Sequence, residues 1–173
     1  MNLSLRNPAP EFLSAAEELY LESFPPEERR PWGDIVSGPA GPQLRLIFRD
    51  GAFAGIITTW DLGAWTYVEH FAILPSMRGG GIGALVLERL AGMDEKPLLL
   101  EVERPGDGNP MASRRIEFYR RNGFALLDYD YIQPPYAPGL PEVPLRLMCT
   151  DPATDAEAAT RALHSRVYGF RFS

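Results

Sequence analysis

Glycines at positions 79, 80, 81 and 83 lie between an apolar stretch and a segment with helical periodicity. The first N–H groups of a helix have no partner within the helix, and the helix dipole adds positive charge there. Glycines also lack the side chains that would keep a phosphate away from these groups. Residues 67–90 therefore predict a site for the pyrophosphate of a cofactor, the alternative being a plain tight turn.

One motif in this cluster matches the dinucleotide fingerprint G-x-G-x-x-A, formed by Gly79, Gly81 and Ala84. Glu101 or Glu103 follows at about the distance of a ribose-binding acid. This pattern favours an NAD-dependent oxidoreductase. However, the fingerprint normally follows its strand directly, whereas residues 75–78 intervene here.

A second motif, R-x-x-G-x-G, covers residues 78–83. Together with EHFAI at 69–73 and FYRRNGF at 118–124, it resembles the GNAT acetyltransferase superfamily over about residues 44–149. A bacterial branch of that superfamily is resembled by two further segments, LLLEVERP at 98–105 and YIQPPY at 131–136. These segments do not indicate a substrate.

The resemblance implies acetyl-CoA as cosubstrate, without a metal, and a primary amine of a small molecule or peptide as acceptor. It assigns the pyrophosphate mainly to main-chain N–H groups, and the pantetheine arm to the backbone of the preceding strand and to Asn109. The implied cofactor-binding residues are Phe71, Ala72, Ile73, Arg78, Gly79, Gly80, Gly81, Ile82, Gly83, Ala84 and Asn109. A CoA-binding module without turnover is the alternative from another class.

Acetyl transfer needs a neutral amine, whereas a free alkyl amine has a pKa of about 10.4. Glu69 matches the glutamate that often serves as base in the superfamily, and its apolar surroundings predict a raised pKa; a charge on a half-exposed strand face is the alternative. Glu101 and Glu103 are the reserves. Tyr119 matches the usual general acid, which donates a proton to the leaving thiolate; an ordinary core tyrosine is the alternative.

Two further residues are interpreted structurally. His70 adjoins Glu69 in a strand, so it is expected on the opposite face as a packing histidine, with a second base as the alternative. Cys149 has no histidine near it in the sequence, so we expect direct attack in a ternary complex rather than a covalent acetyl-cysteine.

The acceptor site is expected to combine acidic and aromatic side chains, which suit a cationic amine. The candidates are Phe24, Glu28, Trp32, Tyr131 and Tyr136.

Hydrophobic periodicity and turn residues predict the elements that hold these groups. The predicted strands are residues 2–6, 44–49, 52–60, 65–74, 98–103, 124–133 and 143–149. The predicted helices are residues 11–24, 32–36, 81–93, 111–122 and 151–167. Asp50-Gly51 predicts a hairpin. The result is a single mixed α/β domain over residues 1–173, with a GNAT-like acyl-CoA N-acyltransferase fold: an antiparallel meander plus one parallel βαβ crossover.

Composition limits the classes further. The chain has 173 residues, 17 basic and 23 acidic, for a net charge of −6, which disfavours a nucleic-acid surface. It has one cysteine, no stretch long enough for a membrane span and no signal-peptide pattern. We therefore expect a cytoplasmic protein, and the apolar last strand and terminal helix are compatible with a homodimer.

Overall fold

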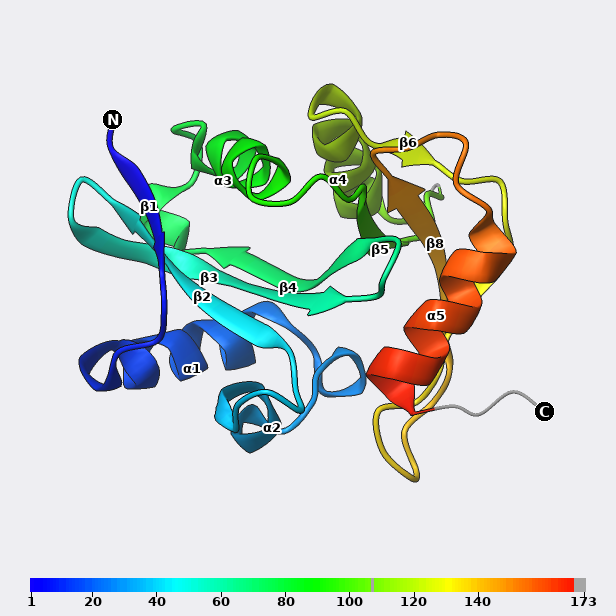
Figure 1. The fold of residues 1–173 in the computed structure, drawn as a ribbon, viewed down its shortest axis with the longest axis horizontal. Coiled ribbons are helices and arrows are strands. Elements are labelled where there is room, and N and C mark those ends of the chain that lie inside the picture. The colour runs from blue at the N-terminus through cyan, green and yellow to red at the C-terminus, as the bar shows by residue number, and fades with distance from the viewer. Residues whose placement is uncertain (107, 170–173) are drawn as a thin grey trace. The chain divides into compact units, whose positions relative to one another are not determined.

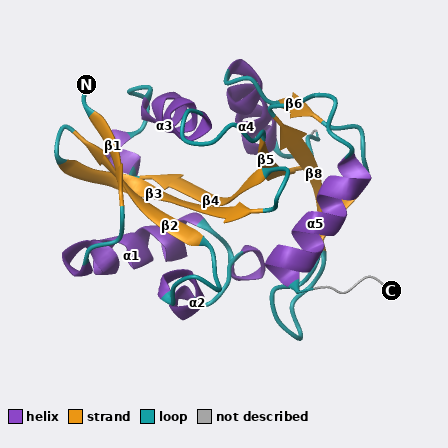
Figure 2. Cartoon of the chain, viewed as in Figure 1, coloured by secondary structure: helices purple, strands orange, loops and turns teal. Residues whose placement is uncertain are grey.

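The computed structural model describes residues 1–106 and 108–169. Figures 1 and 2 show the arrangement of its helices and strands. The strands are β1 (Leu3–Arg6), β2 (Gln43–Arg49), β3 (Ala52–Asp61), β4 (Thr66–Ile73), β5 (Leu98–Glu103), β6 (Ala125–Leu126), β7 (Tyr131–Gln133) and β8 (Val143–Cys149). The α-helices are α1 (Leu13–Ser23), α2 (Trp32–Val36), α3 (Ile82–Ala91), α4 (Pro110–Arg121) and α5 (Ala156–Tyr168), and short 3-10 turns are η1 (Pro10–Phe12), η2 (Pro26–Glu28) and η3 (Pro75–Met77).

The strands form one mixed sheet in the order β1-β2-β3-β4-β5-β8-β6, with β7 also paired to β8. Its pairs are antiparallel except for β4 and β5, which are parallel, as the predicted crossover requires. At the start of this pair the Thr66 N–H donates to the Pro97 carbonyl at 3.0 Å. The predicted fold class is therefore confirmed.

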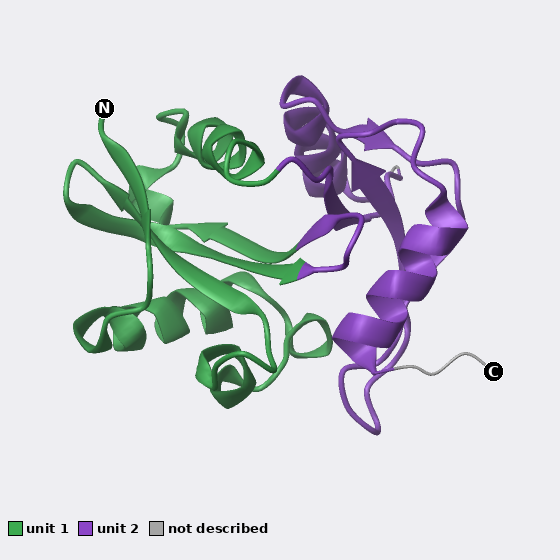
Figure 3. Ribbon diagram, viewed as in Figure 1, with its two compact units in different colours: residues 1–60, 68–94 green, residues 61–67, 95–173 purple. Residues whose placement is uncertain are grey.

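The chain divides into two compact units, residues 1–60 with 68–94 and residues 61–67 with 95–173 (Figure 3). The first unit contains the antiparallel meander. Asp50 and Gly51 have φ values of 49° and 85° and make the tight turn between β2 and β3, where a glycine accepts the left-handed backbone. One layer of the core packs α1 and α2 against the strands through Leu19, Tyr20 and Ile35.

α3 lies on the face of the meander opposite to α1 and α2 (Figure 1). Its buried residues Ile82, Val86, Leu87 and Leu90 recur at helical spacing, so one face of this helix packs inward while Gly83 and the following two residues stay half-buried.

In the second unit β8 pairs with β5 along its length, from Leu99↔Cys149 to Glu103↔Leu145. The other strands that pair with β8 are short. The prediction of one strand over residues 124–133 is wrong: β6 and β7 are separate strands, both paired to β8. The polar run Asp128-Tyr129-Asp130 leaves the sheet between them, and the Tyr129 N–H donates to the Leu127 carbonyl at 3.0 Å.

The two helices of this unit have capped starts. The Asn109 side chain accepts from the Ala112 N–H, with Pro110 as the first helical residue of α4. α5 begins later than predicted, because Asp155 is its cap and accepts from the N–H groups of Glu157 and Ala158. Cys149 is fully buried at the end of β8, with its Sγ 3.2 Å from the Thr154 hydroxyl.

Candidate active site

The glycine turn in the first unit presents bare backbone to solvent. Gly79, Gly80 and Gly81 are exposed, and the φ values of Gly79 and Gly81 are 82° and 76°, which favour glycine. Gly81 is the N-cap of α3, and its carbonyl accepts from the Leu85 N–H at 3.2 Å. Because the N-cap residue is a glycine, no N-cap side chain pairs with the N–H groups of the first helical turn.

Two arginines flank this turn. The Arg78 Nε donates to the Ile73 carbonyl at 3.0 Å, which holds the side chain against the end of β4. Arg49 comes from the end of β2, and its Nη1 lies 2.9 Å from the position that a Cβ on Gly80 would occupy. A side chain at position 80 would therefore displace this guanidinium.

These features fit the diphosphate of a CoA molecule. The turn lacks Cβ atoms, opens a ten-residue helix and lies beside two cations. The residues of β4 that were predicted to pair with the pantetheine arm precede the turn and are separated from it by η3, with Ala72 buried and Phe71 and Ile73 half-buried.

Glu69 lies in β4 with its side chain fully buried. The Arg30 Nε and Nη2 donate to its two carboxylate oxygens at 2.9 and 2.8 Å. Arg30 is itself fixed: its N–H donates to the Tyr20 hydroxyl, which donates back to the Arg30 carbonyl, and its guanidinium lies 5.1 Å from the centre of the Trp60 ring. The planar fork of arginine suits such a two-point contact.

The expectation of a raised pKa at Glu69 is wrong. Burial does raise the pKa of this carboxyl, but His70 and Arg30 together outweigh it and lower the pKa to about 2. Sequence reasoning counted the apolar neighbours. It gave no weight to the adjacent His70, which lowers the pKa most, and it missed Arg30, a cation 39 residues earlier in the chain. Glu69 is thus a firmly ionised carboxylate.

His70 is a packed residue, as interpreted from the sequence. It is 2% exposed, and its Nε2 donates to the Glu28 carbonyl at 2.9 Å. Its ring meets Tyr20 and Phe24 edge to face, with centroids 4.9 and 4.6 Å apart. Its Nδ1 is nevertheless 3.6 Å from Glu69 Oε1, so the two side chains touch at their edges.

The structure brings together the three acceptor candidates of the first unit. Phe24 and Trp32 both pack on Tyr20, with ring centroids 5.6 and 5.5 Å away, and Glu28 is tied to His70 through its carbonyl. All three are half-buried. Tyr20 contacts Phe24, Trp32 and His70, and sequence reasoning did not single it out.

Tyr119 lies in the second unit, on α4, and is 9% exposed. Its ring packs between Phe118 and Phe124, with centroids 5.2 and 5.3 Å away. Burial raises the pKa of this phenol to about 12, against an opposing effect of Arg115. Tyr119 therefore remains a protonated hydrogen-bond donor throughout the physiological pH range.

Asn109, also in the second unit, uses both ends of its side chain. Its Oδ1 accepts from the Ala112 N–H at 3.1 Å, and its Nδ2 donates to Glu103 Oε2 at 2.6 Å. The residue predicted to reach the pantetheine arm is thus also the cap of α4.

The remaining acceptor candidates, Tyr131 and Tyr136, belong to an aromatic group in the second unit. Tyr131 is fully buried beside His164, whereas Tyr136 is half-buried against Tyr168, with ring centroids 5.1 Å apart. Tyr168 also donates to Glu101 Oε1 at 2.9 Å, and Tyr67 donates to the same oxygen. Glu101, a reserve base, is therefore held by phenols. Sequence reasoning gave no role to Tyr67 or Tyr168. The combination of acidic and aromatic side chains, which was expected of the acceptor site, is the signal that could have found them.

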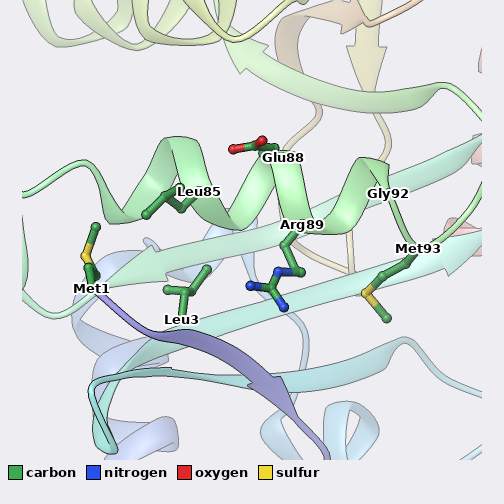
Figure 4. A pocket seen from close by; sticks show the side chains of 7 residues that line it. All are labelled: Met1, Leu3, Leu85, Glu88, Arg89, Gly92 and Met93. Carbon is green, nitrogen blue, oxygen red and sulfur yellow. The ribbon is translucent and has the colours of Figure 1, made fainter.

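A separate pocket of about 430 Å³ lies in the first unit, where α3 meets the start of β1 (Figure 4). Leu3 and Leu85 line its apolar part, and Arg89 projects into it from the last turn of α3. None of the predicted site residues lines it, so it is no part of the candidate site.

Comparisons with known proteins agree with this geometry. A family profile described as an acetyltransferase (GNAT) domain matches residues 43–126. A solved structure of a GNAT-family protein from Bacteroides thetaiotaomicron is 38% identical, with 99% of this chain and 100% of that chain covered and a TM-score of 0.86. The chain belongs to the GNAT family.

Two more distant structures share the fold of this GNAT protein. Arabidopsis thaliana Naa50, in complex with the bisubstrate analogue CoA-Ac-MVNAL, is 21% identical with a TM-score of 0.57, covering 86% of this chain and 98% of that one. The ribosomal-protein-S18-alanine N-acetyltransferase of Escherichia coli is 16% identical with a TM-score of 0.59, covering 90% and 98%. No curated protein matches the sequence.

Within residues 1–106 and 108–169 there is no group of three or more histidine, cysteine or acidic side chains that could hold a metal ion. No helix in that part of the chain has the length and apolar character needed to cross a membrane.

Proposed function

We propose that this GNAT protein transfers an acetyl group from acetyl-CoA to a primary amine by direct attack in a ternary complex. The exposed glycine turn at the start of α3 carries the proposal, because it is the family's cofactor motif in a backbone shape that admits a phosphate. Membership of the GNAT family also removes the support for a nicotinamide-dependent oxidoreductase, which rested on the glycine pattern alone.

The residues that would hold the cofactor follow from the turn. The N–H groups of Gly79 to Ala84 face its diphosphate, Arg78 adds positive charge, and the backbone of Phe71 to Ile73 pairs with the pantetheine arm, with Asn109 as a further contact. When bound, acetyl-CoA supplies the acetyl group as an activated thioester.

Tyr119 is proposed as the group that stabilises the leaving thiolate. The conjugate acid of a thiolate has a pKa of about 8.5, below the value of about 12 for this phenol. Tyr119 therefore acts first as a hydrogen-bond donor to the developing negative charge, which favours departure of the thiol without a permanent charge on the tyrosine.

Glu69 is proposed as the acceptor of the amine proton, under a condition set by the structure. A carboxylate whose two oxygens are both bound by Arg30 and whose pKa is about 2 is a weak base. Withdrawal of Arg30 would remove its part of the effect that lowers this pKa and would raise the basicity of Glu69, while His70 supplies the other part. Movement of the segment that carries Arg30, which also carries the acceptor candidates Glu28 and Trp32, is therefore part of the proposed reaction.

The acceptor is proposed to be a small-molecule or peptide amine. The Arabidopsis structure is of a complex with a bisubstrate analogue, CoA-Ac-MVNAL, and the Escherichia coli enzyme is named for an alanine of ribosomal protein S18; both support this proposal. Phe24, Glu28 and Trp32 in the first unit, and Tyr131 and Tyr136 in the second, are the proposed contacts.

Thermal melting with and without ligand tests the cofactor. A ligand at 100 times its Kd stabilises the folded state by about 2.7 kcal/mol. We expect acetyl-CoA to raise the melting temperature and NADH to leave it unchanged; the reverse pattern would overturn the proposal. A screen of amines for release of free CoA then distinguishes an enzyme from a CoA-binding module without turnover.

A further inference from the structure

Arg49 is the residue beside the glycine turn that no motif in the sequence points to. It ends β2, about 30 positions before the turn, and the fold alone brings its guanidinium to Gly80. In a chain with a net charge of −6, a cation placed beside a predicted phosphate cradle calls for an explanation.

The Arg49 side chain lies next to Gly80 and Asp50. Its Nη1, Cζ and Nη2 lie 2.9, 3.6 and 3.7 Å from the place where a Cβ on Gly80 would stand, so the guanidinium lies over the bare backbone of that glycine. Its Nε is 3.7 Å from the Asp50 carboxylate. The side chain therefore lies between Gly80 and the Asp50 carboxylate.

Asp50 is in turn oriented by the start of β1. The Asn2 N–H donates to the Asp50 carboxylate at 2.7 Å, and the Asp50 N–H donates to the Asn2 carbonyl at 2.8 Å. The Arg49 side chain remains 36% exposed, so it keeps donors within reach of a ligand while its support is fixed.

We propose that Arg49 is a cofactor-binding residue that donates to the pyrophosphate of CoA beside the N–H groups of residues 79–84. This inference rests on the proposed function. Arginine binds phosphate oxygens with two parallel N–H donors, and such charge-assisted hydrogen bonds are among the strong ones. Gly80 then has two purposes: it opens the backbone to the phosphate, and it makes room for Arg49.

The test compares CoA affinities by calorimetry, which does not depend on turnover. Arg49→Met keeps most of the aliphatic length and removes the donors. We expect it to weaken CoA binding about tenfold or more, as the loss of a hydrogen bond to a charged group predicts. Arg49→Lys retains the charge but lacks the two parallel N–H donors of arginine. Its CoA affinity should lie between those of the unsubstituted protein and Arg49→Met.

Arg89→Met is the matched control. It removes the same charge from the same unit, at the opposite end of α3, where Arg89 lines the separate pocket of Figure 4. Equal weakening by Arg49→Met and Arg89→Met would show a general charge effect and would overturn the proposal.

Shortened ligands identify the phosphate involved. The loss caused by Arg49→Met should be the same with 3′-dephospho-CoA as with CoA, and it should vanish with S-acetylpantetheine, which has no pyrophosphate. A loss confined to CoA would assign Arg49 to the 3′-phosphate and overturn the proposal, as would undiminished CoA binding by Arg49→Met. If the unsubstituted protein does not bind CoA at all, the proposed function itself fails, and this inference fails with it.

Discussion

Arg30 and Glu69 form a two-point ion pair inside the first unit, with N–O distances of 2.9 and 2.8 Å and side chains that are 11% and 0% exposed. The two residues are 39 positions apart, so the pair ties the segment between α1 and α2 to the middle of β4. The same carboxylate is the proposed base. The first three predictions test its structural role and its chemical role.

Replacing Arg30 by methionine should lower the free energy of unfolding by about 3–5 kcal/mol, because it leaves a buried carboxylate without its main cation. Urea denaturation measures the change. The double variant Arg30→Met/Glu69→Leu should recover most of the loss, since a buried ion pair can be replaced by apolar groups at little cost.

The control for this prediction is an exposed ion pair of the same length. Arg161 and Glu157 are 2.9 Å apart on α5, with side chains 63% and 64% exposed. Arg161→Met should cost no more than about 0.5 kcal/mol. Similar losses in the two variants would contradict the burial argument.

The lowered pKa of Glu69 predicts how stability depends on pH. The folded pKa of about 2 lies below the ordinary value of 4.5, so the unfolded chain binds more protons and the free energy of unfolding rises with pH. This contribution is complete above pH 4.5 and is lost as the pH falls toward 2. Denaturation curves between pH 2 and 7 should show a shallower dependence in Glu69→Gln; an unchanged slope would mean that another carboxyl is responsible.

Glu69→Gln should also lower kcat for acetyl transfer by about 100-fold or more, the usual contribution of a general base. The glutamine is nearly isosteric, and it can still accept from Arg30, so the affinity for CoA should change little. Turnover equal to that of the unsubstituted protein would restrict Glu69 to its structural role and direct attention to Glu101 and Glu103.

Tyr119→Phe should reduce kcat by about 100-fold while leaving the fold and CoA affinity intact, because only the hydroxyl is removed from a ring that packs on Phe118 and Phe124. Since burial raises the pKa of Tyr119 to about 12, the rate should not fall between pH 7 and 10 through loss of its proton. Steady-state kinetics over this range checks both statements, and an active Phe variant would contradict the assignment.

Gly81→Ala tests the turn itself. At a φ of 76° a Cβ costs about 1–2 kcal/mol, so we expect lower stability together with weaker CoA binding. Gly33→Ala is the control, since Gly33 lies in α2 and a Cβ there would meet nothing within 4 Å. That variant should be as stable as the parent or more so. Binding that survives Gly81→Ala unchanged would remove the turn from the cofactor site.

Local patterns predicted much of the fold. The bounds of α2, β5 and β8 agree with the expected ranges, because prolines, glycines and runs of apolar residues mark them in the chain itself. The prediction of one strand over residues 124–133 was wrong. The β-forming residues there suggested a single strand, and the short polar run that breaks it was given too little weight.

The site was predicted less well, because its properties depend on residues that meet only in the folded chain. The motif located the glycine turn, but Arg49 reaches it from another strand. The sign of the pKa shift at Glu69 was wrong because the prediction counted burial alone, whereas His70 and the distant Arg30 together lower the pKa. Residues that act through tertiary contact leave no spacing for a sequence pattern to detect.

Cys149 has a practical consequence for these experiments. It is the chain's one thiol, and it is fully buried at the end of β8. A disulfide reagent added to a reaction mixture should therefore titrate only the CoA released by turnover, without a background from the native protein. The same reagent would begin to label the protein when it unfolds, so a single colorimetric signal reports product formation in one experiment and loss of structure in another.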